Sequence, residues 1–201
     1  MRILVTCFEP FGRDAVNASR EAVALLPDAV GGHRLEKCVL PVSFVRSPEA
    51  LARACSEVSP DMILMTGQAP RSEVCLERIA VNWAISSGPD NDGLRAAGER
   101  IYPGAPDGLF TPLPVDSLAS ALSGRGLPAK VSNSAGTFVC NRLYYEALHR
   151  CAGIPSLFVH VPLTPAQADA RVPARPSLPA TVSMAVLREL ISMLGDCNPA
   201  V

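Results

Sequence analysis

Short apolar runs alternate with helix-patterned stretches along nearly the whole chain, and this alternation constrains the fold more than any other feature of the sequence. The run 2–7 (RILVTC) is rich in β-branched residues and apolar on both faces, which predicts a buried strand. In 47–58, Ser47 followed by Pro48 marks a helix start, and apolar residues recur on one side. Because helices fall between most strands, we expect an α/β fold whose sheet is covered on both faces and is parallel apart from one or two strands.

The predicted elements follow one another as a single domain over 1–201, with no internal repeat and no second core. The proline-rich stretch 164–179 predicts a surface loop, and the turn-rich stretch 86–93 opens a region dominated by loops up to about residue 113. Strands are predicted at 2–7, 35–42, 61–66, 74–83, 130–134 and 155–162, and helices from Asn17 or Ser19 to Pro27 and at 47–58, 116–123, 139–152 and 180–195.

The charge and hydropathy of the chain exclude several classes of partner. Its 201 residues include 18 basic and 19 acidic side chains, and the net charge of −1 removes the usual electrostatic motive for binding nucleic acid or an anionic membrane. No run approaches the ~18 apolar residues that a membrane-spanning helix needs. The first apolar run soon meets Glu9, which does not fit a signal peptide. We therefore expect a soluble protein of the cytoplasm.

Seven cysteines are a large number for a chain of this composition. The count is odd and no two form a C-x-x-C pair, which favours free thiols in a reducing compartment over a disulfide scaffold. The three histidines have no cysteine at the spacing of a zinc site, and the phosphate-loop, dinucleotide-binding and serine-elbow motifs are absent. We therefore predict no metal and no cofactor. Nucleophilic catalysis by a cysteine is the chemistry for which the chain has suitable residues, namely cysteines with histidines and carboxylates that could assist them.

Cys140 is the thiol best placed for such chemistry. It lies just inside the helix predicted at 139–152, after the turn 135–137. The orphan amides and the positive dipole end of a helix N-terminus favour a thiolate over a thiol, and they also favour a developing oxyanion. The competing interpretation is structural, because Cys140 begins an apolar stripe that continues through Leu143 and Ala147. The pattern alone gives the two interpretations about equal weight.

His160 is the histidine that fits a base for this thiol. His149 follows Cys140 by nine residues on one helix, which places it on the opposite side and roughly 13 Å further along. His33 lies near the start of its strand. His160 lies near the end of its strand, and ligand sites of α/β sheets lie beyond the carboxyl ends of strands. A core histidine beside Phe158 is the alternative.

Glu77 is the third candidate, because a carboxylate is costly within the apolar run 74–83 unless it has a partner. In a strand, the adjacent Arg78 points to the other face, whereas an imidazolium would suit the carboxylate. A carboxylate that orients a histidine is the usual third member of a nucleophile–base pair. A surface-edge pair of Glu77 with Arg78 remains an equal alternative on pattern alone.

Four separated stretches carry a family resemblance. They are TCFEPFG (6–12), GQAPRSEVCLERIAVN (67–82), SNSAGTFVCN (132–141) and FVHVP (158–162). In their order and spacing they resemble the pyroglutamyl peptidase I family, also called pyrrolidone carboxyl peptidases. These are cysteine peptidases that remove an N-terminal pyroglutamate from peptides. The resemblance runs from residue 2 to about 195.

The resemblance implies a fold, a catalytic triad and a substrate. The fold is a single-domain three-layer α/β/α sandwich with a mixed, mostly parallel twisted sheet, and the family's usual assembly is a homotetramer. Glu77, Cys140 and His160 match the catalytic triad, and the implied partners are peptides with an N-terminal pyroglutamate. The positions that match the family's substrate pocket are Phe8, Phe11, Gln68, Phe138 and Val139.

The sequence also departs from the family's pattern. Cys7 and Arg13 replace two glycines of the first motif, and Cys7 is expected close to the site. Ser87 and Gly88 stand where many members carry an arginine and a bulky apolar residue before P-D-N. Two alternatives therefore stay open: a thiol amidase for another small lactam or N-acyl amide, and a catalytically degenerate binding protein on the same fold.

Overall fold

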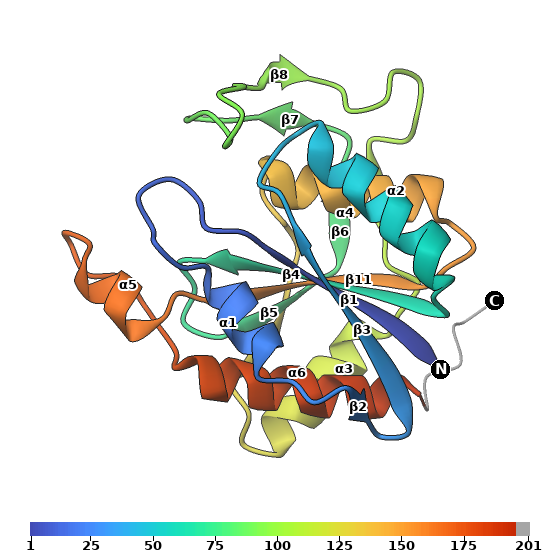
Figure 1. The fold of residues 1–201 in the computed structure, drawn as a ribbon, viewed down its shortest axis with the longest axis vertical. Helices are drawn as coiled ribbons and strands as arrows, with labels where there is room; N and C mark the ends of the chain where they lie inside the picture. The colour runs from blue at the N-terminus through green and yellow to red at the C-terminus, as the bar shows by residue number, and fades with distance from the viewer. Residues whose placement is uncertain (196–201) are drawn as a thin grey trace.

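Seven strands form one sheet in the order β10-β5-β11-β4-β1-β3-β2, as Figure 1 shows for the computed structural model, which describes residues 1–195. Two small antiparallel ribbons, β6 with β9 and β7 with β8, lie outside this sheet. The strands are β1 (Arg2–Phe8), β2 (Ala29–Val30), β3 (His33–Leu40), β4 (Met62–Ala69), β5 (Val74–Glu77), β6 (Ile79–Val81), β7 (Ala84–Ile85), β8 (Ala97–Glu99), β9 (Gly108–Phe110), β10 (Ala129–Ser132) and β11 (Ser156–Pro162).

Helices cover both faces of the sheet, and each face has its own core. One face is covered by α1, α3 and α6, and the other by α2 and α4 (Figure 1). These two cores explain why β1 is apolar on both sides. Ile3 and Val5 belong to the core on the face of α1 and α6, while Leu4 and Phe8 belong to the core on the other face. The helices are α1 (Ala18–Ala24), α2 (Arg46–Val58), α3 (Val115–Gly124), α4 (Val139–Arg150), α5 (Pro165–Asp169) and α6 (Ala180–Leu194).

The sheet is mixed and mostly parallel, which confirms the predicted fold class. Strands β3, β1, β4 and β11 are parallel to one another. Strand β5 is antiparallel to β11 and parallel to β10, and β2 is antiparallel to β3. Three strands therefore run against the other four, one more than expected, because the two-residue β2 was not predicted.

The single extended run predicted at 74–83 is wrong, because the chain leaves the main sheet at Arg78. Strand β5 ends at Glu77, and β6 pairs with β9 instead of continuing the sheet. The Arg78 guanidinium turns outward to Asp116 and to Asn133 Oδ1, the latter at 2.9 Å. A charged side chain that finds its partners at the surface breaks the strand where the apolar pattern alone would continue it.

The stretch predicted as a surface loop at 164–179 contains the short helix α5. The Thr164 hydroxyl accepts a hydrogen bond from the Gln167 amide, and the Gln167 side chain accepts one from the Thr164 amide at 3.0 Å. This capping box closes the first turn of the helix. Helix α6 begins at Ala180 and ends at Leu194, close to the prediction, whereas Cys197 lies outside the described residues. None of the helices within residues 1–195 is long and apolar enough to cross a bilayer.

Candidate active site

Glu77 and His160 meet on the face of the sheet that α4 covers. The strands β5 and β11 are antiparallel neighbours, with Phe158 opposite Glu77 and His160 opposite Cys75. Because alternate residues of a strand share a face, Phe158 and His160 point to the same side as Glu77. His160 Nδ1 lies 2.8 Å from Glu77 Oε1, and both side chains are buried.

Helix α4 brings Cys140 to the same place. Cys140 is the second residue of α4 and is half-buried, and its thiol forms a hydrogen bond with His160. The sulfur lies against Gly67, which is paired with His160 in the register of β4 and β11. A Cβ atom added at Gly67 would lie 3.0 Å from Cys140 Sγ and 3.0 Å from Phe158 Cζ. The missing side chain of Gly67 thus makes room for the thiol.

The surroundings of His160 favour its charged form. Burial by itself lowers the pKa of His160, but hydrogen bonds to Cys140 and Glu77, together with their negative charges, raise it to about 9. Arg71 Nη2 lies 3.9 Å from Glu77 Oε1, and the Tyr144 hydroxyl donates a hydrogen bond to the Glu77 carbonyl at 2.8 Å. An imidazolium next to a thiol stabilises the thiolate. The alternative interpretation, in which Glu77 pairs with Arg78 at a surface edge, is wrong because Glu77 is fully buried.

The N-terminus of α4 offers backbone donors beside the thiol. Its N-cap residue is Phe138, and no side chain within residues 1–195 caps the first-turn amides. The Asn141 side chain instead binds the preceding ribbon: it accepts from Val81 N at 2.9 Å and donates to Val81 O at 2.9 Å and Trp83 O at 3.1 Å. This role was not predicted from the sequence, although Asn141 lies within the motif at 132–141.

A pocket of about 820 Å³ opens at the carboxyl ends of β1 and β4 and includes Cys140 in its wall. Its inner part is apolar and aromatic. The Phe11 and Phe138 rings lie 5.1 Å apart, and Phe44 packs edge-on against Phe138 at 5.2 Å. All five residues that the sequence predicted for a substrate pocket line this one: Phe8, Phe11, Gln68, Phe138 and Val139.

Comparisons with known proteins agree with this geometry. The sequence profile of the family described as "Pyroglutamyl peptidase" matches residues 1–194. The chain is 42% identical over 173 residues to the pyrrolidone-carboxylate peptidase of Lactobacillus helveticus, covering 84% of this chain and 86% of that one. A crystal structure of a mutant (A199P) pyrrolidone carboxyl peptidase from Pyrococcus furiosus superposes with a TM-score of 0.92 at 35% identity, covering 98% of this chain and 99% of that one. The chain belongs to the pyroglutamyl peptidase family.

A second solved structure supports the same assignment. Pyroglutamyl peptidase I of Bacillus amyloliquefaciens superposes with a TM-score of 0.92 at 31% identity, over 100% of this chain and 99% of that chain. The resemblance stated from the four motifs is therefore confirmed, and so is the prediction of a hydrolase of the cysteine peptidase type.

Gln68 lies in a polar network that the sequence analysis missed. Its Nε2 donates to Asp14 Oδ2 at 2.9 Å, and its Oε1 accepts from Ala18 N at 2.8 Å. Gln167 Nε2 bonds both Asp14 Oδ2 and Gln68 Oε1, and Arg171 Nη2 donates to Asp14 Oδ2 at 2.8 Å. The network joins the loop after β1, the end of β4 and α5, which lie beyond the carboxyl ends of the central strands (Figure 1). In this family member, Gln68 therefore helps to hold the pocket wall.

The departure at Ser87 and Gly88 leaves open space. These residues line a second pocket of about 600 Å³ that shares Phe11 and Phe138 with the first. Arg95 Nη1 donates a hydrogen bond to the Ser87 carbonyl at 3.0 Å, so a guanidinium lies nearby although position 87 is a serine.

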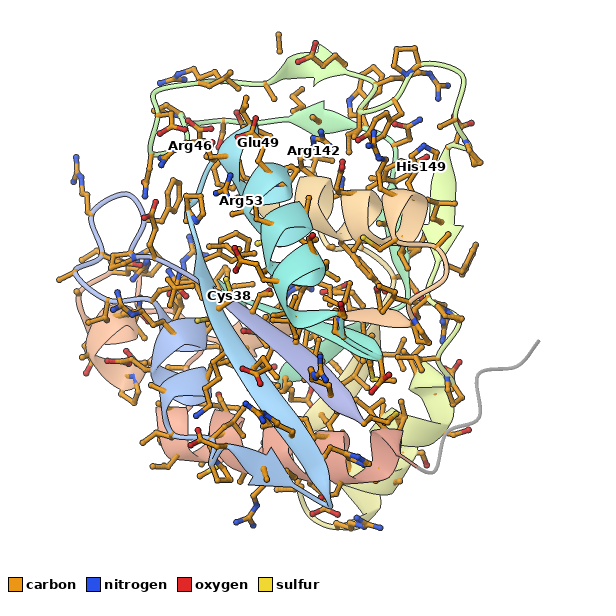
Figure 2. All side chains as sticks on the ribbon, turned by 45° about the vertical axis from the view of Figure 1, so that its right-hand side comes forward. Cys38, Arg46, Glu49, Arg53, Arg142 and His149 are labelled. Carbon is orange, nitrogen blue, oxygen red and sulfur yellow. The ribbon has the colours of Figure 1, made fainter. Side chains whose placement is uncertain are left out.

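The remaining histidines and Cys7 lie away from the site. The ring of His149 lies 4.7 Å from that of Tyr102, near the C-terminal end of α4 (Figure 2). His33 Nδ1 lies 3.5 Å from the N-terminal nitrogen. The expectation that Cys7 lies close to the site is wrong, because its side chain packs on the opposite face of the sheet, where burial raises the pKa of its thiol to about 12.

Helix α4 carries a second thiol at its other end. Cys151 is the C-cap residue of α4, and a hydrogen bond from the Cys55 thiol of α2 lowers the pKa of Cys151 to about 7. The same hydrogen bond, together with burial, raises the pKa of Cys55. Within residues 1–195, no group of three or more His, Cys, Asp or Glu side chains is arranged to hold a metal ion.

Proposed function

We propose that this protein hydrolyses the amide bond after an N-terminal pyroglutamate of peptides, with Cys140 as nucleophile, His160 as acid and base, and Glu77 as the residue that orients His160. The observation that carries the proposal is the chain of contacts from Glu77 through His160 to the Cys140 thiol, which lies in the wall of an apolar pocket. Membership of the pyroglutamyl peptidase family supports the same substrate.

The proposed reaction has two steps. The Cys140 thiolate adds to the carbonyl carbon of pyroglutamate, and the uncapped amides at the start of α4 stabilise the oxyanion. The C–N bond then breaks, His160 protonates the leaving amine, and a thioester remains on Cys140. In the second step, His160 takes a proton from water, whose oxygen attacks the thioester. The thiolate leaves, and free pyroglutamate is released.

The inner pocket suits an uncharged ring. The lactam of pyroglutamate carries no α-ammonium, so its site needs apolar walls and a few polar contacts rather than a carboxylate. Phe8, Phe11, Phe138 and Val139 supply such walls in our proposal. Gln68 supplies a polar contact in our proposal. Its side-chain amide lines the pocket and is held in place by hydrogen bonds to Ala18 and Asp14.

We propose that 1–201 acts as one peptidase domain that assembles as a homotetramer in the cytoplasm. The unbroken family match over 1–194 supports the single domain, and the free cysteines of residues 1–195 support a reducing compartment. Light scattering coupled to size-exclusion chromatography tests the tetramer, because a monomeric mass would contradict it.

Release of an arylamine from a pyroglutamyl arylamide tests the activity. We expect turnover by the unaltered protein, none by Cys140→Ala, and near-normal turnover by the control Cys151→Ser. Prolyl and N-acetylalanyl arylamides separate this function from that of a more general thiol amidase, which would cleave all three at similar rates. A catalytically degenerate binding protein would cleave none.

A further inference from the structure

The outer part of the pocket is strongly basic, in contrast to its apolar inner part. Arg13, Arg171 and Arg175 line it, and Asp14 is its one acidic residue, so three positive charges and one negative charge leave a balance of +2. The whole chain has a net charge of −1. Positive charge is thus concentrated at the mouth of the pocket, which attracts anions toward it.

Two of the three arginines are free to meet a ligand. Arg171 is held by Asp14, with Nη2 to Oδ2 at 2.8 Å. Arg13 and Arg175 are exposed, and within residues 1–195 neither side chain forms an ion pair or a hydrogen bond. Glu9, four residues before Arg13, is already engaged, since its Oε1 accepts from Val42 N at 3.0 Å and from Asn91.

The proposed reaction relates the basic part of the pocket to the leaving amine. That amine takes its proton from His160, which is paired with Gly67 in the register of β4 and β11. Beyond this pair, β4 continues to Gln68 and the chain after β11 continues to Leu163, both in the pocket wall. The segment that ends at Arg175 follows. In the proposed reaction, a leaving peptide that follows the ends of these two strands away from Cys140 would meet the basic part of the pocket.

We propose that Arg13 and Arg175 form a subsite for a carboxylate on the leaving part of the substrate. This inference rests on the proposed function and names its substrate class: pyroglutamyl peptides with a carboxylate within a few residues after pyroglutamate. A guanidinium matches a carboxylate in geometry and charge. The carboxylate comes either from an acidic side chain or from the free C-terminus of a short peptide. Arg13 stands where the family's pattern has glycine, so the subsite is a property of this chain.

Matched peptides test the subsite. To test a carboxylate from an acidic side chain, kcat/KM for pyroglutamyl-alanyl-glutamate amide is compared with kcat/KM for pyroglutamyl-alanyl-glutamine amide. To test a carboxylate from the C-terminus, kcat/KM for the glutamine peptide with a free C-terminus is compared with kcat/KM for its C-terminal amide. From exposed ion pairs of ordinary strength, we expect kcat/KM to be about 3- to 20-fold higher for the peptide with the carboxylate, and salt to reduce this ratio.

Variants show whether the two arginines cause the preference. The double variant Arg13→Gln, Arg175→Gln is expected to lose the preference and to cleave the charged and neutral members of each pair at equal rates. Arg20→Gln, an exposed arginine on α1 outside the pocket, is the matched control and keeps the preference. Equal cleavage of both members of each pair by the unaltered protein overturns the subsite, and so does a preference that survives in the double variant.

Binding measurements separate this inference from the proposed function. Calorimetry with the Cys140→Ala variant measures the affinity for the intact peptides without turnover. If the unaltered protein cleaves no peptide but the Cys140→Ala variant binds the charged peptides several-fold more tightly than the neutral ones, the proposed function fails and the subsite stands. If the neutral peptides are cleaved but neither rate nor affinity depends on the carboxylate, the function stands and the subsite fails.

Discussion

His160 Nδ1 lies 2.8 Å from Glu77 Oε1, and neither side chain has appreciable contact with solvent. The carboxylate occupies Nδ1, which leaves Nε2 as the ring nitrogen for the Cys140 thiol. A buried charge without a partner is costly, so each of the two residues stabilises the charged form of the other. This pair fixes the orientation of the imidazole and favours its protonated form.

Glu77→Gln tests the orienting role. We expect kcat to fall by roughly 10²- to 10⁴-fold, because the amide neither fixes the tautomer nor stabilises the imidazolium. Removal of the carboxylate also lowers the pKa of His160 from about 9, so the alkaline limb of the kcat/KM profile should move to lower pH. Glu73→Gln, at a partly exposed glutamate paired with Lys130, should leave the profile unchanged. An alkaline limb that does not move in Glu77→Gln would contradict the role.

The raised pKa of His160 also predicts how stability depends on pH. A group whose pKa rises from 6.5 to about 9 on folding contributes stability that is fully present below pH 6.5 and is lost as the pH rises through about 9. We expect the free energy of unfolding to fall by up to about 3 kcal/mol across this range. Urea unfolding at a series of pH values measures it. The slope should flatten in His160→Asn and persist in His33→Asn, and equal slopes in these two variants would count against the shift.

Gly67→Ala is expected to impair the enzyme without adding or removing a functional group. The new methyl group would lie 3.0 Å from Cys140 Sγ and would push the thiol away from His160. A displacement near 1 Å costs roughly 10²-fold in rate. Gly124→Ala is the matched control, because no atom lies within 4 Å of the added Cβ there. Steady-state rates with the pyroglutamyl arylamide decide the matter, and comparable activity of the two variants would show that the thiol tolerates the methyl group.

Asn141→Ala is expected to destabilise the fold. The buried amide makes three hydrogen bonds to the backbone of Val81 and Trp83, and its removal leaves those groups without their partner. We expect a loss of about 2–3 kcal/mol in the free energy of unfolding, measured by urea denaturation. Asn133→Ala removes an exposed contact with Arg78 and should change stability by less than about 0.5 kcal/mol. Similar losses for both variants would contradict a special role of Asn141.

Gln167→Ala tests whether the network behind Gln68 shapes the pocket. Gln167 does not line the pocket but bonds Asp14 and Gln68, which do. We expect KM for the arylamide to rise by roughly 3- to 10-fold with kcat little changed, the pattern of a loss of uniform binding. Asp169→Asn, on the same short helix and exposed, is the control. A selective fall in kcat would instead place Gln167 in the chemistry.

Apolar patterns were sufficient to predict the α/β architecture, whereas the grouping of Cys140, His160 and Glu77 was predicted through the family resemblance. Cys140 lies at a helix start and His160 near a strand end, positions that apolar patterns and breakers can indicate, whereas Glu77 stood out only as a carboxylate within an apolar run. The break at Arg78 escaped the pattern because it depends on Asp116 and Asn133, partners distant in the sequence.

Helix α5 could have been predicted from local sequence, whereas the contacts of Gln167 and the space at Ser87 and Gly88 could not. The Thr164–Gln167 spacing of α5 is that of a capping box and was available in the sequence. The bond from Gln167 to Asp14 joins residues 153 positions apart, and no local pattern shows it. The open space at Ser87 and Gly88 likewise depends on aromatic rings that come from distant segments.

The two thiols of helix α4 have a practical consequence for covalent probes. Cys140 at the start of the helix bonds an imidazolium, and Cys151 at its end has a pKa of about 7, so both favour reaction with an electrophile near neutral pH. Eleven residues of helix separate them by roughly 16 Å, too far for one small reagent to block both. Labelling stoichiometry therefore overcounts active sites, and an inhibitor screen should begin from a Cys151→Ser background.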